Sequence, residues 1–213
     1  MKSIIIGAGT YGEVYLAYLQ EANVEVVGFV DDNPILQGKT IDGLPILGNT
    51  SELEKIKRQY NIEAAYCPIG NNELRVKLLS EAKEIGYKTP NYIHPSVILS
   101  PNIKMGEGVY ILLGSQIMPY VQIEDYVMIS MNVNVAHHSI LRKGTFLSTG
   151  VNYGASIEAK EYAYVGIGAT IMTGLHVLGS RCLIGAGAVV IKDVPDNAIM
   201  AGVPAKLIKM KDN

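Results

Sequence analysis

The sequence is poor in the features that mark several large classes of protein. It has only two cysteines, Cys67 and Cys182, too far apart for a CxxC motif, so neither a disulfide framework nor a zinc knuckle is indicated. Its 18 basic and 20 acidic side chains give a net charge of -2, which argues against a nucleic-acid partner. The N-terminal apolar run stops at Gly7, too short for a signal peptide or a membrane span. We therefore expect a cytoplasmic protein with no membrane partner.

What the 213 residues do contain is enough apolar material for a core, with 48% hydrophobic and 18% charged residues. In about the first 90 residues, stretches typical of strands and helices alternate. We predict strands at 2–6, 24–30, 64–68 and near Tyr92, and helices at 13–21, after a Ser or Thr cap in 50–52, and at 73–84. This alternation predicts a parallel sheet covered by helices, the size of one mononucleotide-binding half of a Rossmann-like fold. We assign it to residues 1–95.

The remainder, residues 96–213, follows a period of six. Every sixth residue from Leu99 to Val189 is apolar, with no insertion apparent over about 96 residues. This period is typical of an all-β hexapeptide β-helix, in which three short strands close a coil of about 18 residues, here for about five coils. A β-sandwich with a fortuitous period is the alternative. Glycines that would form its corners are Gly144, Gly150, Gly154, Gly168 and Gly174.

Residues 18 apart should stack in such a coil. One predicted column contains His137, Ala155 and Thr173, and another contains Thr149, Ile167 and Gly185. The first would bring a backbone N–H near residue 155 close to the His137 imidazole, a geometry suited to acyl transfer. The polar corner at His137 could equally be a solvated surface, and we interpret His94 and His176 as structural.

A family resemblance rests on longer motifs. The segment VGIGATIMTGLHVLGSRCLIGAGAVVIKDVPDNAIMAGVPAKLI follows a domain with GAGTYG, VDDNP and IGNNELR. Over essentially its whole length the chain resembles the sialic acid O-acetyltransferase-like family of left-handed β-helix acyltransferases. That family includes bacterial N-acetyltransferases of nucleotide-linked 4-amino-4,6-dideoxy sugars. The resemblance implies a left-handed β-helix, a homotrimer with acetyl-CoA between neighbouring β-helices, a nucleotide-sugar substrate on the N-terminal domain, and no metal.

The resemblance also assigns residues. It implies His137 as the general base, with His138 where the family usually has an acidic residue; His138 could accept a hydrogen bond but adds no negative charge. The Ala155 N–H would stabilise the oxyanion. Phe146 stands where some members have a histidine near the thioester, and can only pack. The implied substrate contacts are Gly9, Thr10, Tyr11, Asp31, Asp32, Gly70 and Asn71, and the acetyl-CoA positions are Phe146, Ala155, Ile167 and Gly185.

The glycine loop is open to more than one interpretation. Gly7, Gly9 and Gly12, with Asp31 about 20 residues on, match the dinucleotide fingerprint. Because half a sheet leaves no place for a second nucleotide, we favour the pyrophosphate of a nucleotide sugar at the helix N-terminus. A structural turn and NAD are the alternatives, and the Asp31–Asp32 pair could be a solvated turn.

Three other functions compete with N-acetylation. A zinc hydratase of the γ carbonic anhydrase type shares the β-helix but needs three convergent histidines, and the H-x4-H spacing is absent. A non-catalytic nucleotide-sugar-binding scaffold and an O-acetyltransferase of a sialic acid or related sugar stay open. The residues leave the nucleotide base, the sugar and the acceptor atom undetermined.

Overall fold

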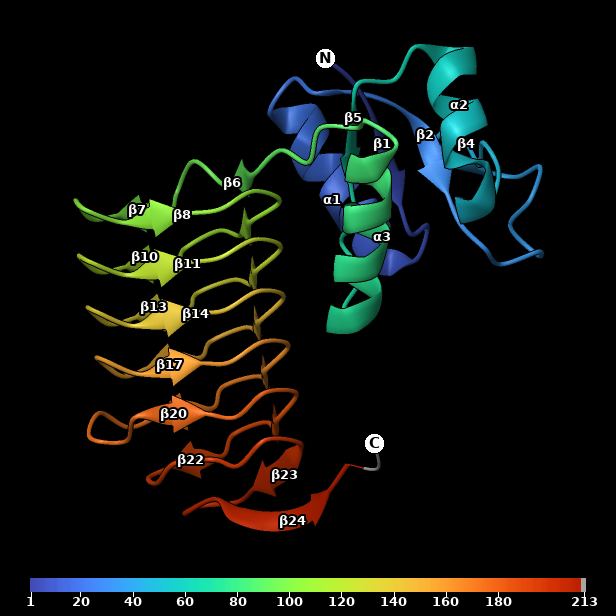
Figure 1. The fold of residues 1–213 in the computed structure, drawn as a ribbon. Helices are drawn as coiled ribbons and strands as arrows, with labels where there is room; N and C mark the ends of the chain where they lie inside the picture. Colours follow the sequence, from blue (N-terminus) through green and yellow to red (C-terminus); the bar gives the residue numbers. More distant parts are fainter. Residues whose placement is uncertain (212–213) are drawn as a thin grey trace. The chain divides into compact units, whose positions relative to one another are not determined.

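The computed structural model describes residues 1–211 and divides the chain into two compact units, Met1–Pro90 and the residues from Asn91 onward (Figure 1). Each unit is described by itself. Among residues 1–211, none of the helices combines the length and the apolar content needed to cross a bilayer.

The N-terminal unit is built on the predicted parallel sheet. Its strands lie in the order β2 (Glu25–Val30), β1 (Lys2–Ile6) and β5 (Ala64–Tyr66), with the helices α1 (Thr10–Glu21), α2 (Leu53–Tyr60) and α3 (Asn72–Glu84) between and after them. Successive residues of β1 are fully buried, as expected of a central strand covered on both faces. A small antiparallel hairpin, β3 (Thr40–Ile41) and β4 (Leu44–Pro45), was not predicted.

The helical turn before α2 begins one residue earlier than expected. Asn49, rather than Thr50 or Ser51, caps the 3₁₀ turn Thr50–Glu52: its side chain accepts from the Ser51 amide, and the Glu52 carboxylate accepts from the Asn49 amide.

The second unit is a parallel β-helix whose strands form three sheets. The first sheet contains β7 (Ile98–Leu99), β10 (Gln116–Ile117), β13 (Asn134–Val135), β16 (Asn152–Tyr153), β19 (Thr170–Ile171) and β22 (Val189–Val190). The second contains β8 (Lys104–Met105), β11 (Gln122–Ile123), β14 (Ile140–Leu141), β17 (Glu158–Ala159) and β20 (Val177–Leu178). The third contains β6 (Tyr92–Ile93), β9 (Tyr110–Ile111), β12 (Met128–Ile129), β15 (Phe146–Leu147), β18 (Tyr164–Val165), β21 (Leu183–Ile184), β23 (Ala198–Ala201) and β24 (Lys206–Met210).

The two ends of the β-helix differ from expectation. The strand near Tyr92, predicted to close the first domain, pairs instead with β9 and opens the β-helix. Within the described residues the first sheet alone stacks six strands, so the solenoid is about one coil longer than expected. At the far end β24 reverses direction and pairs antiparallel with β23.

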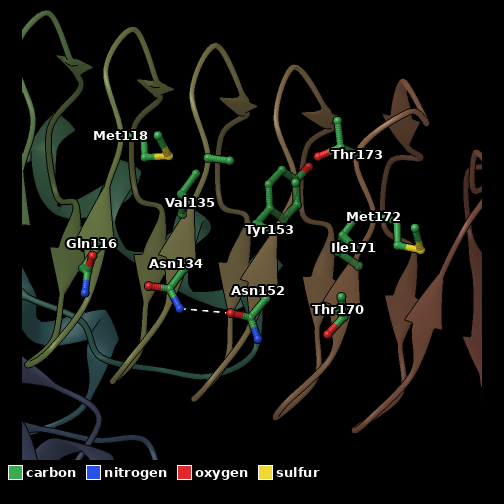
Figure 2. A pocket seen from close by; sticks show the side chains of 12 residues that line it. Gln116, Met118, Asn134, Val135, Asn152, Tyr153, Thr170, Ile171, Met172 and Thr173 are labelled. Atoms are coloured by element: carbon green, nitrogen blue, oxygen red, sulfur yellow. Dashed lines mark hydrogen bonds between the residues drawn. The ribbon is translucent and has the colours of Figure 1, made fainter.

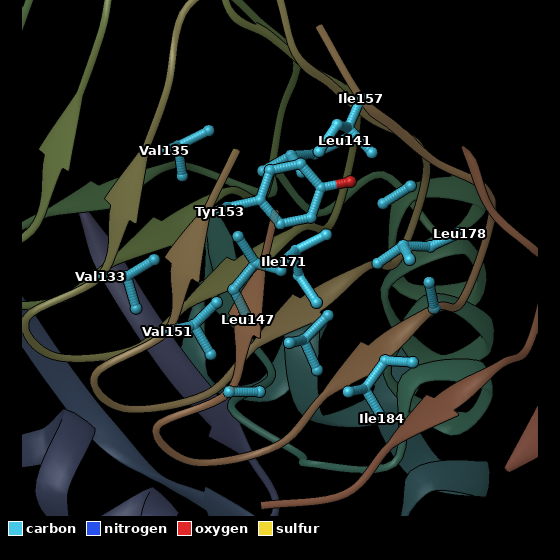
Figure 3. Close-up of a cluster of buried hydrophobic side chains, with 14 of the residues drawn as sticks. Val133, Val135, Leu141, Leu147, Val151, Tyr153, Ile157, Ile171, Leu178 and Ile184 are labelled. Carbon is cyan, nitrogen blue, oxygen red and sulfur yellow. The ribbon is translucent and has the colours of Figure 1, made fainter. Parts of the chain in front are cut away.

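The core is a continuous column of inward aliphatic side chains. Figure 3 shows Val135, Tyr153 and Ile171 from successive coils of the first sheet, together with Leu141 and Leu147 from the other two. All five are 2% exposed or less. Burial of these side chains at about 25 cal/mol per Å² is the main stabilising contribution to a solenoid of this kind.

The corners depend on left-handed backbone conformations. Gly144, Gly150, Gly168 and Gly174 have positive φ, which confirms their predicted role. Gly154 does not have a positive φ. A Cβ atom at this position would lie 2.6 Å from the backbone nitrogen of Thr173 in the next coil, so glycine is needed here because the two backbones approach closely.

One extra residue breaks the register of the β-helix after Thr173. Tyr153 pairs with Ile171, 18 residues on, but Ala159 pairs with Leu178, 19 residues on. The prediction of an uninterrupted period is therefore wrong. The inward side chains of the later strands are Leu178, Ile184 and Val190, whereas the predicted Val177, Leu183 and Val189 are half-buried. Both residues of each of these strands are apolar, so the six-residue pattern in the sequence looks the same whichever of the two faces inward.

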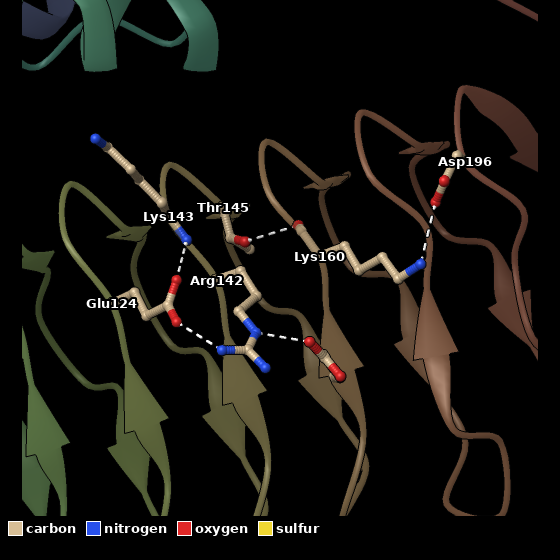
Figure 4. Close-up of polar contacts among 7 residues, drawn as sticks. Glu124, Arg142, Lys143, Thr145, Lys160 and Asp196 are labelled. Atoms are coloured by element: carbon tan, nitrogen blue, oxygen red, sulfur yellow. Dashed lines mark hydrogen bonds and ion pairs between the residues drawn. The ribbon is translucent and has the colours of Figure 1, made fainter.

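An ion-pair ladder joins successive coils on the second sheet (Figure 4). The Arg142 guanidinium donates to Glu124 at 2.7 Å and to Glu158 at 2.6 Å. These hydrogen bonds raise the pKa of Arg142 above its ordinary value, so the guanidinium stays charged. Farther along, a longer contact of 3.6 Å joins Lys160 and Asp196.

Candidate active site

The predicted phosphate loop forms one wall of a pocket of about 270 Å³ in the N-terminal unit. Gly9 is the N-cap of α1 and, within the described residues, no side chain caps this helix, which leaves its first amides available to an anion. The pocket brings together five of the seven predicted substrate residues and adds others from the glycine loop and the end of β5. Its lining is Gly7, Gly9, Thr10, Tyr11, Gly12, Asp31, Pro68, Ile69 and Gly70.

The two aspartates after β2 have different partners. One Asp31 oxygen accepts from the Ala8 amide at 2.7 Å and the other from the Asn33 amide at 2.8 Å. Asp31 therefore fixes the glycine loop at the edge of the pocket. Asp32 turns away from the pocket lining and accepts from the Thr50 amide at 2.7 Å and its hydroxyl at 3.0 Å.

The far wall of the pocket depends on α3. Asn71 is absent from the lining because its side chain caps α3, accepting from the Leu74 amide at 3.1 Å. Arg75, fully buried, donates to the Ile69 carbonyl at 2.8 Å and to the Asn72 side chain at 3.0 Å. Arg75 was not among the predicted site residues, although its place in IGNNELR, on a helix directly after the loop, is a usable signal.

The paired histidines lie at the corner that follows β13. The two Nδ1 atoms are 3.1 Å apart and the rings meet edge to face. His138 has φ of 60° and its ring lies 4.8 Å from that of Tyr120, at the equivalent corner of the preceding coil. One Nδ1 must carry the proton that the other accepts. When His137 is the donor, its Nε2 carries the lone pair, the form that a general base needs.

The column above His137 is the predicted one. The Ser156 amide donates to the His137 carbonyl at 3.0 Å, which places Ala155 over His137. The Ala155 N–H in turn donates to the Thr173 hydroxyl oxygen at 3.2 Å. The predicted stack is confirmed, but the N–H assigned to the oxyanion already has a partner.

The second predicted column is half wrong. Ile167 does follow Thr149, because Gly168 donates to the Thr149 carbonyl. Val165 pairs with Ile184, however, so Gly185 stacks on Gly166. The extra residue after Thr173 is the cause. The proposed acetyl-CoA contacts at Ile167, which is 58% exposed, and Gly185 stay predictions.

A groove of about 340 Å³ runs across the first sheet next to the His137 column (Figure 2). His137 directly follows Ala136, which lines the groove, and Thr173 lines it two coils farther along. Across its floor the side chains of Asn134 and Asn152 are hydrogen-bonded at 3.0 Å. The exposed imidazole is therefore adjacent to a cavity able to hold an elongated ligand.

The remaining candidates have structural partners. Phe146 is buried with its ring 5.3 Å from that of Tyr164, so its contact with acetyl-CoA stays a prediction. His94 accepts from the Ser96 amide at 3.1 Å within its turn. The backbone of His176 donates to Asp193 at 2.6 Å; this bond and the one from Val177 hold the pKa of Asp193 below its ordinary value.

Neither cysteine is suited to nucleophilic catalysis. Burial raises the pKa of both the Cys67 and the Cys182 thiols to about 12, so both remain protonated at neutral pH. In the part of the chain that the structure describes, no three His, Cys, Asp or Glu side chains gather as a metal site.

Comparison with known proteins agrees with this architecture. The PglD N-terminal domain family matches residues 2–82. Among solved structures, PerB from Caulobacter crescentus, determined with CoA and GDP-perosamine, is 31% identical, covers 98% of both chains and has a TM-score of 0.90. The acetyltransferase domain of PglB from Neisseria gonorrhoeae, also solved with acetyl coenzyme A, is 28% identical over 97% of this chain and 98% of that chain, with a TM-score of 0.88. The galactoside O-acetyltransferase of Escherichia coli is 27% identical over 82% of this chain and 77% of its own length.

The fold and these likenesses define an acetyl-CoA-dependent sugar acetyltransferase built on hexapeptide repeats. Within that class the chain belongs to the sialic acid O-acetyltransferase-like family of left-handed β-helix acyltransferases.

Proposed function

We propose that this protein transfers the acetyl group of acetyl-CoA to the amino group of a nucleotide-linked amino-deoxy sugar of the 4-amino-4,6-dideoxy type. The observation that carries the proposal is the His137 imidazole, linked through Nδ1 to His138 and placed one coil below Ala155 at the edge of the groove. The GDP-perosamine bound to the Caulobacter protein supports this substrate class.

The reaction is a direct transfer without an acyl-enzyme. The neutral amine attacks the thioester carbon, a C–N bond forms, and the carbonyl π electrons move to the oxygen. His137 Nε2 takes the proton that the attacking nitrogen loses. When the carbonyl re-forms, the C–S bond breaks and the sulfur leaves with that electron pair. His137 then returns the proton to the sulfur, which yields CoA thiol and the N-acetyl sugar.

His138 supplies orientation in this scheme. The two Nδ1 atoms are 3.1 Å apart. In this scheme His138 Nδ1 is the acceptor and His137 Nδ1–H the donor, the tautomer that leaves the lone pair on His137 Nε2. It performs this task as a neutral acceptor, without the charge that an acidic residue would contribute.

The N-terminal pocket would hold the nucleotide part of the substrate. Uncapped amides at the start of α1 and the glycine loop held by Asp31 suit a pyrophosphate. Acetyl-CoA would lie along the β-helix at the seam between protomers of a homotrimer, the arrangement that the family resemblance implies.

His137→Ala tests the proposal. We expect kcat to fall by about 10²–10⁴-fold with little change in KM, because only proton transfer is lost. The measurement is CoA thiol release from acetyl-CoA with a panel of dTDP-, UDP- and GDP-linked amino sugars. His176→Ala is the matched control, since His176 is exposed and bonds through its backbone.

The panel also separates the alternatives. Turnover only with a sialic acid would favour the O-acetyltransferase. CoA release by no acceptor, or equal rates for His137→Ala and the unmodified protein, would contradict the proposal and favour a binding scaffold. Stoichiometric zinc in the purified protein would favour a hydratase.

A further inference from the structure

The backbone N–H of Ala155 is already engaged. It lies one coil above His137, where a developing oxyanion would be placed, yet it donates to the Thr173 hydroxyl oxygen at 3.2 Å. A ligand oxygen could use this N–H directly only if the Thr173 side chain first moved away.

The hydroxyl group of Thr173, in contrast to the Ala155 N–H, still has a proton to donate. Its oxygen accepts from Ala155, which leaves its own proton to donate, and among the described residues no acceptor takes that proton. Thr173 is exposed and lines the groove. Figure 2 shows its oxygen directed toward the preceding coil, which carries Tyr153. The free donor at this position is therefore the O–H of Thr173.

The backbone around Thr173 is held from two sides. Gly154 has no side chain, and a Cβ there would lie 2.6 Å from the Thr173 amide nitrogen. Directly after Thr173 the extra residue of the β-helix forms a tight turn, with Gly174 at φ of 106° and a bridge between Thr173 and Leu175. Thr173 is thus the last residue in register with His137 before the register changes.

We propose that Thr173 is a further catalytic residue, whose hydroxyl donates a hydrogen bond to the thioester oxygen as that oxygen becomes negative. The inference rests on the proposed acetyl transfer and refines its oxyanion site. The Ala155 N–H orients and polarises the hydroxyl by donating to its oxygen. The proton of the hydroxyl stays on Thr173 throughout; the bond to the ligand oxygen strengthens as the C–N bond forms and weakens when the C–S bond breaks.

The spacing of the column suits this role. Coils are about 4.8 Å apart, so the Ala155 nitrogen lies about one coil above His137, and the hydroxyl oxygen of Thr173, from the next coil, lies 3.2 Å from that nitrogen. A carbonyl between the two could present its oxygen to Thr173 while the attacking nitrogen faces the imidazole.

Thr173→Val tests the proposal because the two candidate donors predict opposite results. Valine keeps the shape but removes the hydroxyl, which also frees the Ala155 N–H. If Thr173 is the donor, kcat falls by about 10²-fold while KM for acetyl-CoA stays near that of the unmodified protein, and Thr173→Ser retains most of the rate. If the Ala155 N–H is the donor, Thr173→Val leaves kcat unchanged or raises it, and the proposal is overturned.

Thr145→Val is the matched control. Its hydroxyl also joins two coils, donating to the Lys160 carbonyl at 3.3 Å, but at a different corner. We expect its kcat to be unchanged. Each variant is checked by thermal unfolding, and Thr173→Ala replaces the valine variant if that one melts below the assay temperature.

The assay uses acetyl-CoA with the same panel of nucleotide-linked amino sugars. A protein that is active as Thr173→Val and inactive as His137→Ala retains the proposed function and loses only the Thr173 role. A lack of CoA release by the unmodified protein overturns both.

Discussion

The coils before Thr173 and the coils after it share one core but differ in the number of residues between stacked positions. Pairs such as Tyr153 and Ile171 are 18 residues apart, whereas Ala159 and Leu178 are 19 apart and Leu183 and Ile199 only 16. A parallel β-helix therefore needs an apolar side chain at each inward position, and the number of residues between those positions can vary. The change of count falls next to the candidate active site, where the His137 column ends.

The largest effect expected from this comparison concerns the shifted strands. Leu178→Ala should lower the free energy of unfolding by about 2–5 kcal/mol, because Leu178 is fully buried. Val177→Ala, at the neighbouring half-buried position, should lower it by less than about 1 kcal/mol. Urea unfolding followed by circular dichroism measures both. Equal effects, or a larger one for Val177, would contradict the shifted register.

Tyr153, in the core before Thr173, carries a hydroxyl group into the interior. The Tyr153 hydroxyl is buried without a hydrogen-bond partner among the described residues, and burial raises the pKa of Tyr153 well above its ordinary value. Tyr153→Phe should therefore raise the free energy of unfolding by about 1–2 kcal/mol, since an unsatisfied buried group is removed. Tyr164→Phe, at a half-buried position, is the control and should change little. A destabilised Tyr153→Phe would show that the hydroxyl has a partner.

The smallest expected effect concerns the surface ion pairs of the second sheet, those of Arg142 and the one between Lys160 and Asp196. Arg142 contacts two carboxylates below 3 Å but is about one third exposed, so Arg142→Met should cost at most about 1 kcal/mol, and less at high salt. Lys160→Met, which loses only the 3.6 Å contact with Asp196, should be close to neutral. Thermal unfolding at low and high salt checks both, and a salt-independent loss for Arg142→Met would point to packing as the cause.

Most of the fold could be predicted from the pattern of apolar residues. The alternation of strands and helices indicated the parallel sheet, although the strand near Tyr92 that it assigned there belongs to the β-helix. The six-residue period indicated the β-helix. The change of count could not be predicted, because Val177 and Leu178, like the two later pairs of strand residues, are both apolar, so either one fits the period. Only the pairing of strands shows which one faces inward.

The candidate site likewise contains parts that could be predicted from the sequence and parts that could not. The glycine loop and the His137 column follow from local sequence and from a regular offset, so they could be predicted. The ligand contacts of Asp32 and Asn71 stay predictions. In the structure both side chains hold backbone amides, and this depends on contacts that spacing does not reveal. The donor role that we propose for Thr173 could not be predicted, because it rests on one hydrogen bond between coils.

The antiparallel strand β24 has a consequence for how these molecules behave at high concentration. A stack of parallel coils ends in unpaired backbone groups, onto which another chain could add in the manner of an amyloid fibril. By running back along β23, β24 occupies part of that terminus with a strand of opposite polarity that carries exposed lysines at 206 and 209. The same strand also exposes Leu207, Ile208 and Met210, so its reversed direction and two lysines are the features that oppose the addition of another chain there.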